Sequence, residues 1–244
     1  MVTGLGVFAS RPGDCRGLQV GGRVFRFILS GMKLYNYFRS SASYRVRIAL
    51  QLKGLPYDYL PVHIAKGDHR KEAYAAVSAD MLVPMLETDD GDRLSQSMAI
   101  IEYLDETQPA VPLLPADALG RAKVRALAQS IACEIHPINN LRVLKYLVRE
   151  LKVDEDAKNT WYQHWVREGL EAFERQLNQL PPSTYCYGET PTLADCCLVP
   201  QIFNAQRFKV SFDGLPRTMA AYEACMALEA FQKAQPSSCP DNEA

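Results

Sequence analysis

The sequence predicts a small α/β domain followed by an all-helical domain. Strand and helix patterns alternate over residues 32–106, whereas no convincing strand appears after a stretch with three prolines at residues 109–115. A proline-rich stretch of this kind is typical of a linker. The 244 residues suffice for two ordinary domains. We therefore expect the first domain at 32–110, the second at 116–235 and a tail at 236–244.

Composition excludes several classes of partner. Hydrophobic residues make up 48% of the chain and charged residues 23%, as in soluble globular proteins. A formal net charge of −1 argues against nucleic acid or an anionic membrane surface as partner. No apolar run approaches the roughly 20 residues that span a bilayer.

Cysteine and histidine usage predicts a reducing compartment and no metal. The seven cysteines are odd in number and scattered, and the four histidines are not at metal-ligand spacing. A disulfide framework is not expected, and we predict a cytoplasmic protein.

The first 31 residues differ from the rest because they are rich in glycine and arginine. A targeting peptide is one interpretation, but the stretch has no uninterrupted apolar core after a basic start. We instead expect residues 1–31 to be a disordered extension or a mis-assigned start, with Met32 as the natural first residue of the fold.

The first domain begins as a β-α-β unit. Residues 33–37 alternate as a strand, residues 42–53 have a helical apolar pattern, and residues 57–62 alternate again. Gly54 follows the helix, as a helix-terminating glycine should. We expect the two strands to be parallel, because a helix joins them.

The rest of this domain is predicted from turn and helix signals. A polar stretch at 66–79 is expected to hold a short helix, and residues 83–87 form a third strand. The acidic turn at 89–92 leads to a fourth short strand. A helix at 97–106 closes the domain.

Helical patterns fill the second half. We predict a long helix over 117–152 with a kink at Pro137, and others over 160–180 and 217–234. Another begins at Thr192, where an acid three residues later, Asp195, completes a capping-box signature.

The most informative stretch lies where the first strand runs into the first helix, at Arg39-Ser40-Ser41-Ala42-Ser43. The first turn of a helix has free N–H groups and a partial positive charge, so it favours an anion. Serine hydroxyls placed there can donate to a thiolate, a carboxylate or a phosphate. Alternatively, Ser40 or Ser41 merely caps the helix.

The run from Ser40 to Leu50 resembles the signature of the zeta-class glutathione transferases. Further motifs of that class follow in order at similar spacing, and they are Val83-Pro84, Gln96-Ser97, Ile135-His136-Pro137-Ile138-Asn139-Asn140, Thr192-Leu193-Ala194-Asp195, Leu198-Val199-Pro200-Gln201 and Asn204-Ala205-Gln206-Arg207-Phe208-Lys209-Val210. The resemblance covers residues 32–235. It implies a thioredoxin-like glutathione-binding domain followed by a helical domain, and a homodimer.

The resemblance also implies an activity and a set of site residues. The activity is glutathione-dependent cis–trans isomerisation of maleylacetoacetate to fumarylacetoacetate, in tyrosine and phenylalanine catabolism. Catalytic roles fall to Ser40 as main thiolate donor, to Ser41 next, and to Arg39 and Arg207 as anchors for substrate carboxylates. Glutathione contacts are implied at Ser40, Ser41, His69, Val83, Gln96, Ser97, His136, Asn140 and Arg142.

Each of these residues also has a plainer interpretation. A Val83-Pro84 step fits a cis-proline that exposes the backbone of Val83 to an extended peptide, or an ordinary edge-strand proline. Ser97 can hold a carboxylate or simply cap a helix. On spacing alone, His136 and Asn140 are satisfied polar residues near a kink. His69 alone suggests a solvated loop, and Arg207 a structural ion pair.

The mechanism follows from what rotation about a conjugated double bond requires. A thiolate adds to the alkene, the resulting single bond rotates, and expulsion of the thiolate leaves the trans isomer. A thiol has a pKa near that of cysteine, so hydrogen-bond donors and positive potential are needed to ionise it at neutral pH. The serine cluster at a helix start provides both.

Other functions stay open at this point. Maleylpyruvate isomerases tend to carry paired arginines where this chain has Leu141-Arg142, which favours maleylacetoacetate. The further alternatives are a transferase acting on small α-halo acids and a non-catalytic binding module of the same fold. Two positions depart from the family: Ala42 replaces a frequent cysteine, and Ser78-Ala79 replaces Asn-Pro.

Overall fold

The computed structural model of the chain describes residues 18–20, 23–25 and 31–243. Within the extension expected at 1–31, strand β1 (Leu18–Val20) pairs antiparallel with β2 (Arg23–Phe25). This pair belongs to a unit separate from Gly31–Ala244. The remainder of that expectation lies outside the described residues.

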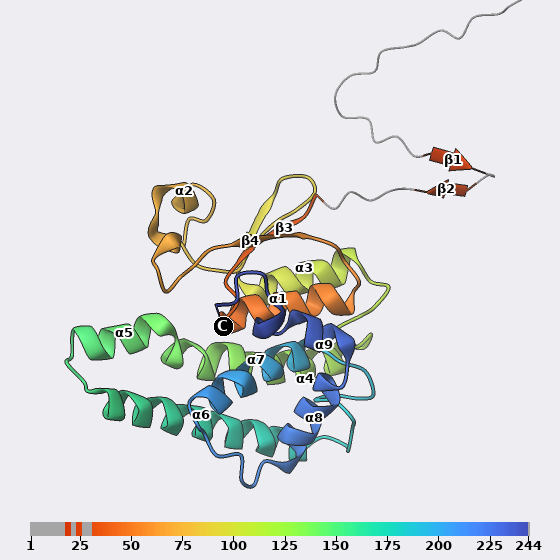
Figure 1. Cartoon of the computed structure of the whole chain (residues 1–244). Coiled ribbons are helices and arrows are strands. Elements are labelled where there is room, and N and C mark those ends of the chain that lie inside the picture. The colour runs from red at the N-terminus through yellow and green to blue at the C-terminus, as the bar shows by residue number, and fades with distance from the viewer. Residues whose placement is uncertain (1–17, 21–22, 26–30, 244) are drawn as a thin grey trace, which may run out of the picture. The chain divides into compact units, whose positions relative to one another are not determined.

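The first domain is built on a four-stranded mixed sheet of order β4-β3-β5-β6 (Figure 1). Its strands are β3 (Lys33–Asn36), β4 (Asp58–Pro61), β5 (Met85–Glu87) and β6 (Arg93–Ser95). Strand β3 pairs parallel with β4 and antiparallel with β5, which pairs antiparallel with β6. The parallel β-α-β unit predicted from the sequence is confirmed.

Two helices cover this sheet, α1 (Ser41–Leu52) and α3 (Ser97–Thr107), and two short turns lie beside it, a 3₁₀ turn (Asp68–Arg70) and α2 (Glu72–Ala75). Gly54 has φ +64° just after α1, a conformation that few other residues adopt at low cost. In Figure 1, α1 and α3 lie between the sheet and the helices of the second half.

The second half is helical, as predicted. Its elements are α4 (Ala118–Gln129), a π-helical turn (Ser130–Ile135), a 3₁₀ turn (Pro137–Asn139), α5 (Leu141–Arg149), α6 (Glu155–Asn178), α7 (Leu193–Arg207), α8 (Pro216–Met226), α9 (Glu229–Ala234) and a final 3₁₀ turn (Pro236–Ser238). None of the helices in the described ranges is both long and apolar enough to cross a bilayer.

The long helix expected over 117–152 is interrupted rather than kinked. Pro137 has no N–H to continue an α-helix, and Asn140 adopts an extended conformation with ψ 148°. The Asn140 side chain then caps α5 by accepting the N–H of Arg142. Just before this break, His136 contacts Ser41 at the start of α1.

Two other helix boundaries differ from the sequence prediction. Helix α6 begins earlier than residue 160, because Asp154 caps it by accepting the N–H of Ala157. The last helix, expected as one element over 217–234, is the pair α8 and α9, and Leu228 is extended between them.

The core centres on α7, most of whose side chains are buried, and α7 packs against α1, α4 and α8. The predicted capping box at its start is confirmed: Asp195, fully buried, accepts the N–H of Thr192 at 2.7 Å and that of Cys186 at 2.9 Å. The first bond satisfies the N–H of the N-cap residue, and the second satisfies a buried loop N–H.

Candidate functional site

A cavity of about 300 Å³ opens where α1 begins, and α7 ends beside it. The loop after β4, the segment around Val83 and residues 136–145 complete its wall. Most of the site residues predicted from the sequence line it, namely Arg39, Ser40, Ser41, His69, Val83, His136, Asn140, Arg142 and Arg207. Gln96 and Ser97 are not in that lining.

The start of α1 presents donors to this cavity. Ser40 is the N-cap, and its Oγ accepts the N–H of Ser43 at 3.2 Å. The capping role predicted for this serine is therefore present, and its hydroxyl proton stays available as a donor. The N–H groups of Ser41 and Ala42 have no partner among the described residues. A helix start with free N–H groups and hydroxyls suits an anion.

Ser41 is held by a chain of side chains from the helix break. Its Oγ lies 2.8 Å from Nδ1 of His136, and Nε2 of His136 lies 3.2 Å from Nδ2 of Asn140. The other end of the Asn140 amide, Oδ1, accepts the N–H of Arg142 at 3.1 Å. At the break beside Pro137, His136 and Asn140 thus lie within hydrogen-bond distance of each other.

The direction of the hydrogen bonds from Asn140 to His136 and Ser41 follows from the orientation of the Asn140 amide. Because Oδ1 of Asn140 accepts a backbone N–H, its Nδ2 donates to Nε2 of His136. Burial, with Arg45 and Arg142 nearby, lowers the pKa of His136 to about 3, so the ring is neutral at neutral pH. Its one proton is then on Nδ1 and is donated to Oγ of Ser41, which leaves the Ser41 hydroxyl proton free to point into the cavity.

The cavity wall is cationic and contains no carboxylate. Its charged residues are Arg39, Arg70, Arg142, Lys145 and Arg207, and no Asp or Glu is among its lining residues. Such a wall favours anions, because no carboxylate within the lining compensates its cations.

Two of these cations were missed by the sequence reasoning. Arg70 is adjacent to His69, and Lys145 lies one helical turn after Arg142 on α5. The i, i+3 spacing of Arg142 and Lys145 was a readable signal once α5 was known to begin at residue 141.

Arg207 does not form the structural ion pair that was its plainer interpretation. Its Nη1 donates to Oδ1 of Asn204 at 3.4 Å, and no carboxylate contacts it within the described part of the chain. Its guanidinium is exposed at the cavity, with a planar fork suited to a carboxylate.

His69 also contributes to the wall, from the turn before α2. Its Nδ1 is buried without a partner in the described residues. Burial, followed by the nearby charges of Arg70 and Lys145, lowers the pKa of His69. A neutral imidazole with a free, buried nitrogen can make a polar contact to a ligand. This observation favours a ligand contact for His69 over a solvated position in a loop.

The Val83–Pro84 peptide bond is cis, as predicted from the sequence, and neither the N–H nor the C=O of Val83 has a main-chain partner in the described residues. The nearby loop departs from the family at Ser78, whose Oγ donates to Oδ1 of Asp80 at 2.7 Å. Tyr74, on α2, donates its hydroxyl proton to the carbonyl of Leu82 at 2.6 Å.

Gln96 and Ser97 lie at the start of α3, as predicted, but outside the cavity lining. Gln96 is exposed with φ 68°, a region that non-glycine residues seldom occupy, and Ser97 is buried. Oγ of Ser97 accepts from Nη1 of Arg45 at 3.3 Å, while Nε and Nη2 of Arg45 are buried without partners in the described part of the chain. A buried guanidinium with unpaired nitrogens provides positive potential at this helix start.

Comparison with known families identifies this arrangement. The family model described as "Glutathione S-transferase, N-terminal domain" matches residues 39–107, and that of the C-terminal domain matches residues 141–229. The chain belongs to the glutathione S-transferase family. Its strand order and helical second half are the thioredoxin-like and helical domains expected from the resemblance, which is confirmed.

Individual relatives place this transferase in the zeta class. It is 50% identical over 212 residues to a maleylpyruvate isomerase of a Ralstonia species, which is 86% of this chain and 100% of that protein. It is 45% identical over 215 residues to a maleylacetoacetate isomerase of Pseudomonas aeruginosa, 87% of this chain and 100% of that protein.

Solved structures agree with this placement. A holo maleylpyruvate isomerase described as a bacterial zeta-class transferase is 49% identical with a TM-score of 0.84, and covers 86% of this chain and 100% of its own. A maleylacetoacetate isomerase from Anaeromyxobacter dehalogenans, with glutathione bound in its active site, is 40% identical with a TM-score of 0.79, covering 87% and 98%.

Proposed function

We propose that this protein is a glutathione-dependent cis–trans isomerase that converts maleylacetoacetate to fumarylacetoacetate. The observation that carries the proposal is the cavity, in which a helix start with two serine hydroxyls faces cations and no carboxylate. One part of this surface suits a thiolate, and the other suits an acid substrate. Relatives named for this reaction, at 41–45% identity, support it.

The residues present fit glutathione, which is an extended peptide with two carboxylates and a thiol. The unpaired N–H and C=O of Val83 suit its backbone. Gln96 and Ser97, beside the unpaired nitrogens of Arg45, suit its γ-glutamyl carboxylate at the start of α3. His69 suits the glycyl end.

When bound, glutathione supplies a thiolate that adds reversibly to the double bond and is released after rotation. Ser40 and Ser41 stabilise negative charge on sulfur by donating their hydroxyl protons, and the start of α1 adds positive potential. His136 and Asn140 are positioning residues, because they fix the orientation of the Ser41 hydroxyl without contributing a charge. Ser40 is proposed as the main donor and Ser41 as the second.

The cations hold the acid substrate and stabilise the negative charge that develops on it. Arg207, at the end of α7, and Arg39 are proposed as carboxylate anchors, and Arg142, near the start of α5, lines the same cavity. Positive groups in a partly water-excluded cavity act more strongly than the same groups in water. These cations need little rearrangement during the reaction, because no protein carboxylate in the lining has to be displaced before substrate binds.

A maleylpyruvate isomerase is the second candidate. Lys145 adds a cation one turn from Arg142, which partly replaces the paired arginines typical of those enzymes. The 50% identical Ralstonia relative has this name. The test is the ratio of kcat/KM for the two acids at saturating glutathione. A ratio favouring maleylacetoacetate supports the first candidate, and one favouring maleylpyruvate assigns the second.

The setting of the activity is part of the same proposal. We place the protein in the cytoplasm as a homodimer, in the breakdown of tyrosine and phenylalanine. Unpaired cysteines support a reducing compartment: six are free among the described residues, and five of these are buried. Light scattering of the purified protein tests the dimer.

A further inference from the structure

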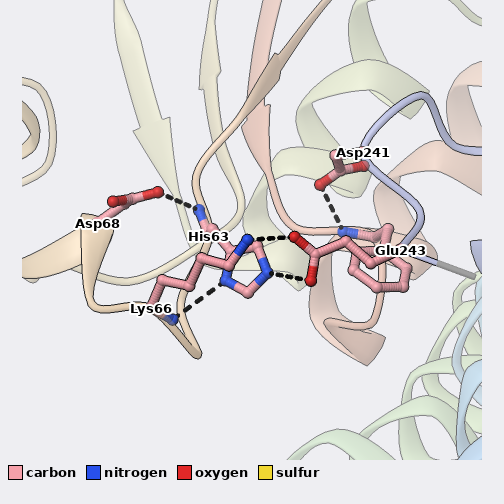
Figure 2. Close-up of polar contacts among 6 residues, drawn as sticks. His63, Lys66, Asp68, Asp241 and Glu243 are labelled. Atoms are coloured by element: carbon pink, nitrogen blue, oxygen red, sulfur yellow. Dashed lines mark hydrogen bonds and ion pairs between the residues drawn. The ribbon is translucent and has the colours of Figure 1, made fainter.

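The end of the chain folds back onto the first domain. After the final 3₁₀ turn, residues 239–243 run along β4 and the loop that follows it. Asp241 and Glu243 make polar contacts there with residues far away in the sequence (Figure 2). We call residues 239–243 the C-terminal clasp.

Asp241 contacts the segment that leads into the serine cluster. Its Oδ2 accepts the N–H of Phe38 at 3.2 Å, and its Oδ1 accepts a short hydrogen bond from the hydroxyl of Tyr59 on β4. Phe38 is 2% exposed and lies two residues before Ser40. A charged acceptor therefore binds the main chain just before the start of α1.

The same residue, Phe38, is also held through its carbonyl, by Arg47. Nη2 of Arg47 donates to the carbonyl of Phe38 at 2.9 Å, and its Nε donates to the carbonyl of Ala234 at 2.9 Å. Arg47 and Asp241 thus bracket Phe38, the first from within α1 and the second from the clasp. The main chain that positions Arg39 and Ser40 is fixed at both of its polar groups.

Glu243 holds the loop after β4. Its two carboxylate oxygens contact Nε2 of His63 at 3.4 Å and the ammonium of Lys66. The N–H of Lys66 donates to Nδ1 of His63 at 3.1 Å, which leaves the ring proton on Nε2 to face Glu243. The far side of this loop lines the cavity through Ile64, Ala65 and His69.

Cys239 adds an apolar contact to the polar contacts made by Asp241 and Glu243. It is 8% exposed and packs in a small cluster with Tyr37 and Phe38, against which Ile64 and Val83 also pack. Tyr37, Ile64 and Val83 are all lining residues of the cavity. The clasp therefore shares one apolar cluster with three lining residues of the cavity.

We propose that the C-terminal clasp is a positioning element for the glutathione half of the site, with Asp241 as its principal positioning residue. The inference rests on the proposed function, because it assigns glutathione to this wall. Asp241 is not a lining residue of the cavity; it acts through Phe38 on the turn that presents Ser40. Small displacements of such a turn lower the efficiency of a bound thiolate.

The test compares Asp241→Asn and Asp241→Ala with Asn242→Ala, whose side chain has no polar partner in the described residues and which therefore serves as the matched control. Initial rates with varied glutathione, and with varied acid substrate, are measured on the full-length chain. Difference absorbance near 240 nm gives the pKa of the bound thiol.

We expect Asp241→Ala to raise KM for glutathione roughly tenfold and to raise the pKa of the bound thiol, while KM for the acid substrate changes less than twofold. For Asp241→Asn, we expect values of KM for glutathione and of the thiol pKa between those of the wild type and Asp241→Ala, because its one amide oxygen can still accept the N–H of Phe38. Asn242→Ala is expected to behave as the wild type.

Tyr59→Phe guards against misfolding of the Asp241 variants, since it removes only the second partner of Asp241 and is expected to give a smaller shift in the same direction. If all variants lose thermal stability while KM for glutathione and the thiol pKa stay at wild-type values, the positioning role is overturned and the clasp is only structural. Failure of the wild type to bind glutathione overturns the proposed function, and this inference with it.

Discussion

Oγ of Ser41 lies 2.8 Å from Nδ1 of His136, across 95 residues of sequence, and this contact joins the start of α1 to the helix break before α5. The histidine is neutral, with its pKa lowered to about 3 mainly by burial. It therefore acts as an orienting donor rather than as a source of charge. The Ser41 hydroxyl is the group whose direction this contact sets.

This relationship predicts the effect of His136→Phe. Without the Nδ1 donor, Ser41 is free to rotate, so we expect the pKa of glutathione bound to the enzyme to rise by up to about one unit. Ultraviolet titration of the bound thiol measures it. The double variant Ser41→Ala/His136→Phe should raise the pKa of the bound thiol no more than Ser41→Ala alone does. If the pKa shifts of the two single variants add in the double variant, His136 acts on the thiol by a route other than Ser41.

Ser40→Ala separates capping from chemistry. Loss of the N-cap should lower the free energy of unfolding by about 1 kcal/mol, and loss of a thiolate donor should lower kcat/KM well beyond that effect. Asp117→Ala is the matched control, because Asp117 caps α4 by accepting the N–H of Gly120 at 2.7 Å, outside the cavity lining. Equal activity losses in the two variants would assign Ser40 to capping alone.

The cationic wall predicts selective defects toward acids. Arg207→Ala and Lys145→Ala should each raise KM for a dicarboxylic substrate by about tenfold or more, with an effect that weakens at high salt. KM for glutathione, measured in the same assays, should change much less. Arg149→Ala, also on α5 but outside the cavity lining, is the control. A uniform change across both substrates would argue against carboxylate anchoring.

The buried histidine predicts how stability depends on pH. Because its folded pKa is depressed below the ordinary value of 6.5, the unfolded chain binds a proton below pH 6.5 that the folded protein does not. This one group should therefore destabilise the fold by about 2 kcal/mol between pH 6.5 and pH 5. Urea unfolding at both values should show a smaller acid-induced loss for His136→Phe than for the wild type. An identical loss in both would mean that His136 titrates normally.

Features set by local sequence were predictable. The capping box at Thr192 and Asp195, the glycine stop at Gly54 and the alternation of β3 and β4 each depend on neighbouring residues. The anion-favouring start of α1 belongs to the same kind of signal, since a serine cluster after a strand defines it. The proposed domain boundaries at 110 and 116 remain predictions.

Features set by tertiary contact were not predictable from one sequence. The restart of α5 at Asn140 depends on a cap that competes with a continued helix, and it determines that Lys145 reaches the cavity. Residues 236–244 had the composition of a tail, yet Asp241 and Glu243 find partners about 180–200 residues away. No local pattern encodes such pairings, because they exist only once β4 and the loop after it are in place.

The dependence of isomerisation on glutathione tests the central claim most directly. Purified protein is mixed with maleylacetoacetate, with and without glutathione, and the reaction is followed by ultraviolet absorbance. The account predicts turnover with glutathione and none above background without it. Absence of turnover despite measurable glutathione binding, with maleylpyruvate equally unreactive, would contradict it.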